Sequence, residues 1–307
     1  MPDNQFTFTI FTPCYNSSKF LYRVFNSLNN LTYRNFEWIV INDASTDNTS
    51  ELIREFIKTA DFEIQFFDLT ENQMLTKNYN IAIKNARGTY FLPAGHDDEF
   101  LPQTLEIFLS YWEKYGTPDY SGISCLCENQ FGNIVGDHFP KSPYLSDYFE
   151  VVFKNKIKGE KWGFTRTEVM REFILPENID VYISEGLMWV GIGSKYKTIY
   201  INEALRVYYV DQINHQGLSS VNCRIKYPVG IRYSEMMMIN KYLHYIHGNM
   251  KTKVACYINY LRMSINTRIS LLKIFNDLDG NQQKFIAFCL LPVGLFFSLL
   301  DKIQNRC

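Results

Sequence analysis

Several familiar sequence signals are missing from this chain, and each absence excludes a class of protein. The seven cysteines include no pair of C-x-x-C spacings, so a zinc-binding module is excluded. No Walker A motif and no G-x-G-x-x-G cradle follows an expected strand, so a bound phosphate would have to be held by side chains and a metal ion. Arg and Lys form no compact cluster, which predicts that there is no nucleic-acid partner.

A secretory signal is also missing from the first five residues, which lack the usual charged and apolar pattern. Together with the cysteine pattern, this predicts a reducing, cytoplasmic environment. The 307 residues are 46% hydrophobic and 16% aromatic, which is typical of a globular protein. The net charge of −1 hides an asymmetry, because residues 221–307 hold 12 Lys and Arg against 4 Asp and Glu. The basic end is a candidate for binding an anionic surface.

Strand-like and helix-like segments alternate over the first hundred residues, each strand followed by a polar loop. This order predicts an α/β fold with a mainly parallel sheet, right-handed crossovers and flanking helices. The expected strands are Phe6–Thr12, Phe36–Ile41, Glu63–Phe67 and Thr89–Leu92, and the expected helices are Lys19–Leu28, Glu51–Ile57 and Leu75–Asn85.

The last of these strands runs directly into two adjacent carboxylates, Asp97 and Asp98. Ligands of open α/β sheets bind beyond the carboxyl ends of the strands, and carboxylate oxygens suit Mg²⁺ or Mn²⁺. The alternative is structural, because Asp98 could simply cap the helix expected over Pro102–Tyr115.

Four motifs occur in the order and spacing of glycosyltransferase family 2, which the chain resembles. They are Thr12–Asn16, Asn42–Asp47, the pair Asn72 and Asn78, and His96–Asp98. The resemblance implies a Rossmann-like GT-A fold and a bacterial-type enzyme of glycan assembly. It places a GT-A domain over residues 1–220, with a nucleotide-binding half (1–100) and an acceptor half (101–220). Residues 221–307 would form a helical extension.

By this resemblance, Pro13 and Tyr15 line a uracil pocket, Asp43 accepts a hydrogen bond from the base, and Ser45 lies nearby. Lys77 falls where the family often has Arg, close to the diphosphate. An aromatic face with a single acceptor suits a pyrimidine imide. The alternatives are structural: Tyr15 covers the sheet edge, Asp43 caps a helix, or Lys77 is a solvated helix residue.

The family's metal motif is Asp-x-Asp, and Gly95 stands where its first Asp would be. Asp97 remains in the second position, beside the diphosphate, and Asp98 follows it. The resemblance implies Mn²⁺ or Mg²⁺ as cofactor, with Asp98 or Asp97 as the direct ligand.

In the second half, the family's base is the Asp of a Glu-Asp pair that opens a helix. Here the pair is Glu185 and Gly186, so Glu185 is the expected base and Asp180 the alternative. Trp162 and His215 are expected in packing and loop roles. Strands are expected over 120–127, 134–138, 197–201 and 205–210, the first two as a hairpin, and short helices over 144–153 and 167–173.

The basic end carries a helical stripe from Val254 to Leu272 and an uncharged run, Phe285–Leu300. At ~1.5 Å per residue the run is shorter than a ~30 Å hydrocarbon core, so it predicts an interfacial or re-entrant hairpin rather than a span. A helix packed on the catalytic domain is the alternative. The expected location is peripheral, at the cytoplasmic face of the inner membrane.

The predicted function is inverting transfer of a sugar from a nucleotide diphosphate donor, a UDP-sugar, to a hydroxyl of a growing glycan or lipid-linked glycan. Two other functions stay open. A nucleotidyltransferase would make the nucleotide-sugar, although no basic triphosphate loop is present. A non-catalytic nucleotide-sugar or glycan-binding relative would explain why Gly95 and Gly186 each replace an acid.

Overall fold

The computed structural model describes residues 5–177, 182–209 and 227–304. Its contacts divide the chain into two units, residues 1–175 with 195–213, and residues 176–194 with 214–307. The division differs from the boundary expected after residue 220, because residues 176–194 group with the C-terminal helices. The two units are described separately.

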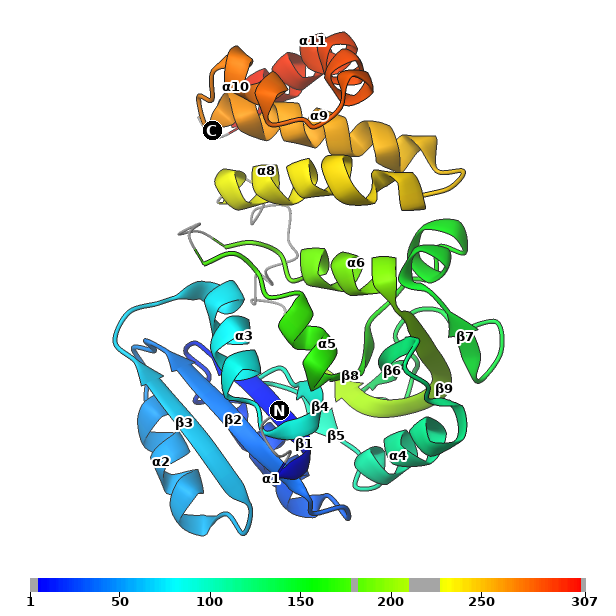
Figure 1. Ribbon diagram of the computed structural model, residues 1–307. Coiled ribbons are helices and arrows are strands. Elements are labelled where there is room, and N and C mark those ends of the chain that lie inside the picture. Colours follow the sequence, from blue (N-terminus) through cyan, green and yellow to red (C-terminus); the bar gives the residue numbers. More distant parts are fainter. Residues whose placement is uncertain (1–4, 178–181, 210–226, 305–307) are drawn as a thin grey trace. The chain divides into compact units, whose positions relative to one another are not determined.

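The first unit is built on a sheet whose first half is parallel, as the alternating pattern predicts (Figure 1). The strands lie in the order β3-β2-β1-β4, and the helices connect them as crossovers. The strands are β1 (Phe6–Cys14), β2 (Phe36–Asp43), β3 (Glu63–Leu69) and β4 (Gly88–Pro93), and the helices are α1 (Leu21–Asn30), α2 (Thr49–Thr59) and α3 (Met74–Asn85).

Burial explains why these segments fold as they do. Every residue of β2 is buried, as expected of an interior parallel strand covered on both faces. The helices α1 and α2 each bury one apolar face, and the rings of Phe25 and Phe56 stack between them with centroids 4.0 Å apart.

The second half of the sheet is mixed, and here several expectations are wrong. The expected strand over 134–138 does not form, and the predicted hairpin is reduced to a tight turn: Ile134 makes an isolated bridge to Glu128, and the N–H groups of Asn129 and Val135 donate to Asn133 O and Cys127 O, each over 2.8 Å. One strand, over Lys197–Tyr208, stands where two were expected. Residues 144–153 begin as a strand and continue as a π-helix. The elements are β5 (Glu99–Phe100), β6 (Tyr120–Asn129), β7 (Tyr144–Ser146), η1 (Glu150–Lys154), β8 (Lys161–Arg166) and β9 (Lys197–Tyr208).

Strand β8 pairs antiparallel with both β4 and β6 and so joins the two halves of the sheet. The order continues β4-β8-β6-β9-β5, with β7 on β9. The helices α4 (Thr104–Tyr115) and α5 (Thr167–Glu172) confirm the expected helices there.

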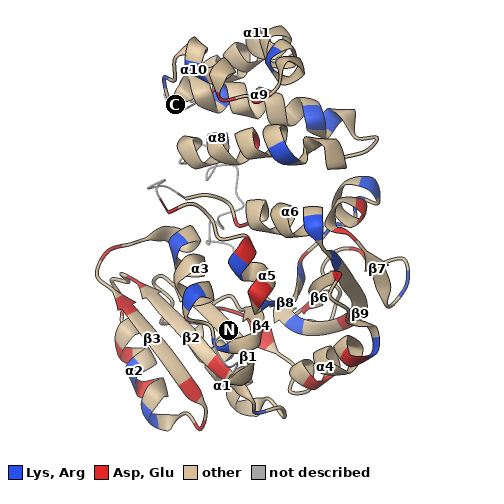
Figure 2. Cartoon of the chain, viewed as in Figure 1, with Lys and Arg blue, Asp and Glu red and all other residues tan. Residues whose placement is uncertain are grey.

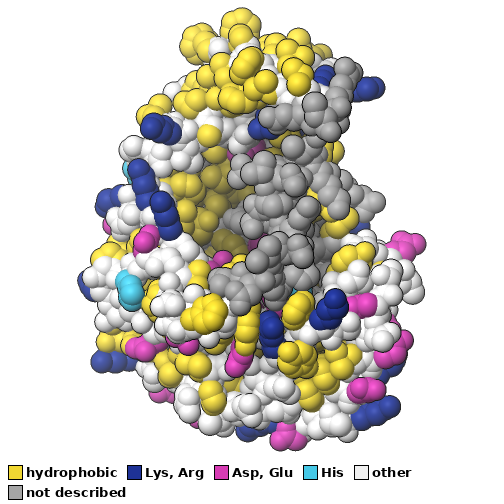
Figure 3. All heavy atoms as spheres, turned by 180° about the vertical axis from the view of Figure 1, so that it is seen from behind, with side chains coloured by type: hydrophobic (Ala, Val, Ile, Leu, Met, Phe, Trp, Pro, Cys, Tyr) yellow, Lys and Arg dark blue, Asp and Glu magenta, His cyan; other side chains and the backbone are white. Residues whose placement is uncertain are grey.

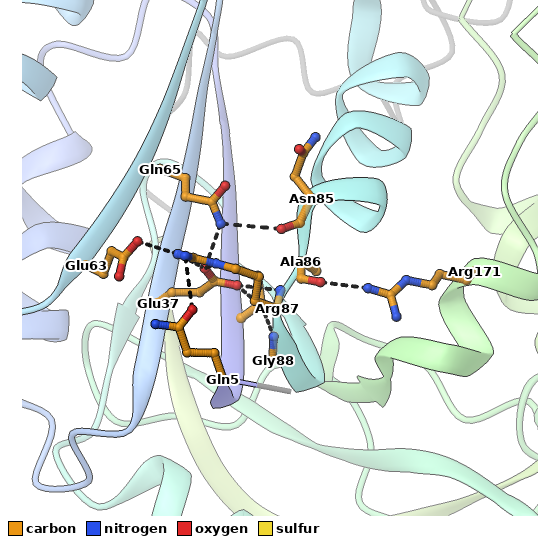
Figure 4. A network of polar contacts seen from close by, with 10 residues as sticks. Gln5, Glu37, Glu63, Gln65, Asn85, Ala86, Arg87, Gly88 and Arg171 are labelled. Atoms are coloured by element: carbon orange, nitrogen blue, oxygen red, sulfur yellow. Dashed lines mark hydrogen bonds and ion pairs between the residues drawn. The ribbon is translucent and has the colours of Figure 1, made fainter. Parts of the chain in front are cut away.

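A buried carboxylate ties together the amino ends of three strands (Figure 4). Glu37 is fully buried in β2 and accepts hydrogen bonds from Thr9 Oγ1 (2.6 Å), Gln65 Nε2 (2.6 Å), and Arg87 N (2.7 Å) and Nε (2.8 Å). Arg87 also pairs with Glu63 on β3. This network satisfies an ionised group inside the sheet, which burial alone would strongly disfavour.

The second unit is helical among its described residues. The expected stripe is divided between α9 and α10, because the chain turns at Arg268, whose φ is 57°. The uncharged run lies in one continuous helix, α11, so the expected hairpin is wrong. The helices are α6 (Gly186–Lys195), α8 (Pro228–Met237), η2 (Met238–Tyr242), η3 (Leu243–Tyr245), α9 (Met250–Asn266), α10 (Leu271–Asn276) and α11 (Asn281–Gln304).

Candidate functional site

The loops after β1, β2 and β4 open at one edge of the sheet. The strands are parallel and in register, with Cys14 opposite Asn42 and Phe11 opposite Pro93. The backbone N–H of Ala94 continues this pairing by donating to Phe11 O over 2.7 Å. The motifs that are far apart in the sequence therefore meet where ligands of α/β sheets bind.

Asp43 ends β2 at this edge and is held by neighbours from the loop and helix after β3. Its carboxylate accepts a hydrogen bond from the Gln73 N–H (2.6 Å) and one from the Asn78 side chain, and the Asn72 side-chain amide donates to its carbonyl (3.2 Å). Both Asn residues of the third motif thus position Asp43. Burial raises the pKa of Asp43, and these hydrogen bonds act to lower it.

The β1 and β2 loops are tied to each other beside Asp43. Ser45 Oγ accepts from the Asn16 N–H (2.9 Å), and Asp47 accepts from the Ser18 N–H (3.1 Å) and from Ser18 Oγ (2.7 Å). Asp47 also accepts from the Thr49 N–H (3.1 Å), which makes it the structural residue of this loop.

Tyr15 presents a ring at this edge, because it lies in the β1 loop with 52% of its surface exposed. Pro13, at the end of β1, is half-buried. Lys77 lies in the first turn of α3, immediately before Asn78. The structure therefore places Pro13, Tyr15, Asp43, Ser45 and Lys77 on the loops and helix start of one sheet edge.

The two adjacent carboxylates have different surroundings. Asp98 is buried, and its Oδ1 accepts a hydrogen bond from Arg206 Nε over 2.8 Å. Its Oδ2 accepts from the Gly95 N–H over 2.6 Å. Burial raises the pKa of Asp98 to about 6, while the Arg206 guanidinium acts to lower it. Asp97 is half-buried.

Glycine at position 95 leaves room beside both carboxylates. A Cβ added to Gly95 would lie 3.1 Å from Asp97 Oδ1 and 3.1 Å from Asp98 Oδ2, so both oxygens face one small space. Across the described part of the chain, no group of three or more His, Cys, Asp or Glu could enclose a metal ion. The pair fits Mg²⁺ or Mn²⁺ only when ligand oxygens, such as those of a diphosphate, complete the shell.

Arg206 is the residue that the sequence analysis missed. It lies on β9 and is 8% exposed. Its ion-pair partner Asp98 is 108 residues away in the sequence, and its Nη1 is also 3.5 Å from Glu160 Oε1. The available signal was a single Arg inside the otherwise apolar and aromatic segment Leu205–Tyr208, since buried charges are normally paired.

Glu185 belongs to the second unit and directly precedes α6, so the expected helix start is present. Its carboxylate accepts a hydrogen bond from the Tyr182 hydroxyl over 3.0 Å. The alternative base, Asp180, and also His215, lie outside the described residues. Trp162 is 5% exposed, stacks on Phe100 with ring centroids 4.9 Å apart, and donates to Pro93 O, as expected of a packing residue.

Known proteins resemble this chain in sequence over part of its length. It is 32% identical over 111 residues to the teichoic acid poly(glycerol phosphate) polymerase of Staphylococcus epidermidis. The aligned residues are 36% of this chain and 15% of that protein. It is 31% identical over 180 residues to an uncharacterised glycosyltransferase of Haemophilus influenzae, 56% of this chain and 55% of that protein. The chain thus spans between 15% and 55% of the length of these two relatives.

Solved structures match nearly the whole chain. Residues 1–349 of TarS from Staphylococcus aureus, in complex with UDP-GlcNAc, superpose with a TM-score of 0.61 at 15% identity, covering 97% of this chain and 89% of that one. The mannosyltransferase PcManGT from Pyrobaculum calidifontis, in complex with GDP-Man and Mn²⁺, superposes with a TM-score of 0.58 at 17% identity, covering 100% and 85%. These matches show the GT-A fold.

The sequence model of one family spans all four motifs. The family is described as glycosyl transferase family 2, and the match runs over residues 9–171, more than half of the chain. The chain belongs to glycosyl transferase family 2.

Proposed function

We propose that this family member transfers a sugar from a UDP-sugar to a hydroxyl of a growing cell-surface glycan, with inversion at the anomeric carbon. The observation that carries the proposal is Asp43, a buried acceptor at the end of β2 that is held by three neighbours. The exposed ring of Tyr15 lies in the loop after the adjacent strand β1. An acceptor that is fixed in advance loses little entropy when a ligand binds.

The nucleoside would be recognised by an aromatic face and a single acceptor. In this proposal Tyr15 stacks on the uracil ring, Pro13 lines the pocket, and Asp43 accepts the hydrogen bond of the base N3–H. Ser45 Oγ accepts the hydrogen bond from the Asn16 N–H, and its hydroxyl would donate to a ligand oxygen. Crystals of TarS in complex with UDP and with UDP-GlcNAc support a uridine donor by analogy.

The diphosphate would lie against Asp97, Asp98 and Lys77. Both oxygens of Asp98 already accept hydrogen bonds, so we assign the direct metal contact to Asp97 and the supporting place beside it to Asp98. A bound Mn²⁺ or Mg²⁺ would neutralise the negative charge of the leaving diphosphate. Lys77 would add a point charge on the same group.

The acceptor hydroxyl needs a base, which we assign to Glu185, with Asp180 as the alternative. The base removes the hydroxyl proton while the acceptor oxygen bonds to the anomeric carbon and the bond to the diphosphate oxygen breaks. Because a single displacement enters opposite the leaving group, the anomeric centre is inverted. Tyr182 would orient the carboxylate through its 3.0 Å hydrogen bond.

The glycan acceptor and the cellular location are proposed from the charge of the chain and from its sequence similarity to a known polymerase. A relative acts as a teichoic acid polymerase, and the second half of the chain is basic and carries an apolar helix. A glycan or lipid-linked glycan at the cytoplasmic face of the membrane fits both features.

Asp43→Asn tests the nucleotide pocket. The amide keeps the shape but loses the charge-assisted hydrogen bond, so we expect UDP affinity to fall about 10- to 100-fold, which corresponds to ~1.5–3 kcal/mol. Titration calorimetry with UDP measures this. Asp119→Asn, at an exposed carboxylate far from the edge, is the control and should bind UDP normally. Unchanged affinity in Asp43→Asn would remove the base-recognition role.

Asp97→Asn tests the metal assignment. We expect this variant to lose the Mn²⁺ dependence of UDP binding while its thermal stability stays close to wild type, because Asp97 is only half-buried. Asp98→Asn should lower both the Mn²⁺ dependence of UDP binding and the thermal stability, since it also removes the buried charge partner of Arg206 and leaves only the more exposed Glu160. UDP titrations with and without Mn²⁺, beside thermal melts, separate the two. Metal dependence that survives in both variants contradicts the site.

A further inference from the structure

The helix α11 has its polar and apolar faces reversed relative to a helix on a water-soluble surface. Such a helix normally buries its apolar stripe and exposes charges. The buried residues of α11 are instead small or polar: Ala287, Gly294, Ser298 and Asp301. Four large apolar side chains are half-buried, namely Ile286, Leu290, Leu291 and Leu300. Eight others are exposed on the other sides of the helix: Phe285, Phe288, Val293, Leu295, Phe296, Phe297, Leu299 and Ile303.

The inward face of α11 is fixed against α9 by specific polar contacts. Arg262 Nε donates to Asp301 over 2.6 Å and Asn266 Nδ2 over 2.7 Å, while Ser298 Oγ donates to Asn266 Oδ1 over 2.6 Å. A Cβ added to Gly294 would lie only 2.7 Å from Leu261 Cβ, so the two helices approach closely. These contacts set which face of α11 points outward.

The outward apolar face extends beyond α11. Leu271 and Leu272, in the first turn of α10, are 57% and 74% exposed. In the space-filling view, apolar side chains gather at the upper end of the molecule, where Figure 1 places α10 and α11 (Figure 3). Contiguous exposed apolar surface of this kind marks an interaction site.

The charged residues near this face are mainly Lys and Arg (Figure 2). Lys284 and Lys302 flank the apolar run, and Arg268 and Lys273 lie beside α10. Two of the three acidic residues here are paired: Asp301 is buried and pairs with Arg262, and Asp277 pairs with Arg232 and Lys273. Asp279 is exposed. A second copy of this chain would bring the same positive charges together, whereas an anionic surface would be attracted.

We propose that α11 lies in the plane of an anionic lipid bilayer, with its phenylalanine-rich face in the acyl boundary and its flanking lysines at the headgroups. The inference rests on the membrane localisation proposed above and names the surface and the lipid charge that would produce it. An amphipathic helix with apolar and basic flanks binds in this way.

The packing of α11 favours this orientation over a membrane span. Among the described residues it is the one helix long and apolar enough to cross, over Asn281–Ile303, with a mean hydropathy of 1.9 in its most apolar 18-residue window. Its 24 residues extend ~36 Å. However, α9 packs along α11 and against α8, and α9 begins with Lys251 and Lys253. A crossing α11 would carry these polar helices into the hydrocarbon or lose its contacts to them.

Vesicle flotation of the full chain tests the proposal, with phosphatidylcholine vesicles that contain or lack phosphatidylglycerol. We expect binding to the anionic vesicles only, and a loss on the order of tenfold or more in Phe288→Glu. Phe131→Glu is the matched control, because Phe131 is 69% exposed in the first unit and Phe288 is 65% exposed in the second. The control should bind vesicles like wild type.

A charge-reversal pair tests the lysines separately. Lys284→Glu with Lys302→Glu should weaken binding, since each basic residue at an anionic surface contributes about fivefold. The control is Lys58→Glu with Lys114→Glu, which makes the same change in net charge at exposed sites of the first unit. This control should bind the vesicles like wild type. Equal binding of all variants, or no vesicle binding by wild type, overturns the proposal, as does a wild-type dimer in solution that Phe288→Glu dissociates.

Measuring the UDP affinity of the same variants distinguishes a failure of the membrane proposal from a failure of the proposed enzymatic function. The nucleotide residues lie in the first unit, so UDP titration should be unchanged in Phe288→Glu. Vesicle binding without UDP binding would leave the lipid surface standing and remove the donor site.

Discussion

Replacing Glu185 with Gln is expected to abolish sugar transfer while leaving UDP-sugar affinity nearly unchanged. A base must reach the acceptor hydroxyl but need not touch the donor, and its loss costs on the order of 10²- to 10⁴-fold in rate. The amide can still accept the hydrogen bond from Tyr182, so the helix start should keep its geometry. Turnover and donor affinity are measured on the same preparation.

Asp180→Asn is the companion variant, because Asp180 is the alternative base. A dead Asp180→Asn beside a near-normal Glu185→Gln would transfer the role to Asp180. Normal turnover in both would leave the reaction without either base. If Glu185 only favours the start of α6, Gln should cost merely ~0.3–1 kcal/mol of stability.

The second large effect concerns stability, and its residue, Glu37, lies at the amino end of β2, whereas the candidate site lies at the carboxyl ends of the strands. Glu37→Gln is expected to lower the free energy of unfolding by about 3 kcal/mol, the lower end for breaking a buried ion pair, because Arg87 is one-third exposed and keeps Glu63. The new amide would also place an N–H₂ group against donors that now share the carboxylate. Denaturant titration measures the loss.

An exposed ion pair provides the control for Glu37→Gln. Asp61→Asn makes the same chemical change in the surface pair with Arg34 and should cost less than about 1 kcal/mol. Glu37 and Asp43 are six residues apart on β2, roughly 20 Å, so the folded Glu37→Gln protein should bind UDP normally. Equal stability of the two variants would show that the buried network contributes little.

Local patterns predicted the first half of the fold well, because each strand and helix there carries its own periodicity. The expected strand Phe36–Ile41 became β2 (Phe36–Asp43), and the expected helix Leu75–Asn85 became α3 (Met74–Asn85). Parallel strands ending at one edge then brought Tyr15 and Asp43 into neighbouring loops, as the motif order predicted.

Predictions failed where distant partners decide the structure. Residues 134–138 looked like the second strand of a hairpin, but their pairing with β6 stops after the isolated bridge at Ile134, and β6 pairs along its length with β8 and β9. The periodic pattern from Val254 to Leu272 did not reveal the left-handed turn at Arg268.

The candidate site shows the same limit. Its motifs led to the prediction of Asp97 and Asp98, but no local pattern reveals that Arg206, on another strand, pairs with Asp98. For α11, the run of uncharged residues predicted an apolar segment but not which of its faces is buried. Which of its faces is buried became visible only from its packing on α9.

The most direct test of the central claim is release of UDP from a panel of UDP-sugars by the full chain, with Mn²⁺ and with or without a glycan acceptor. The proposed function predicts UDP release from one donor that increases with acceptor and disappears in Glu185→Gln. Tight binding of UDP-sugar without any UDP release would contradict it and indicate a non-catalytic relative, in keeping with glycine at positions 95 and 186. Release of pyrophosphate from UTP and a sugar phosphate would indicate a nucleotidyltransferase instead.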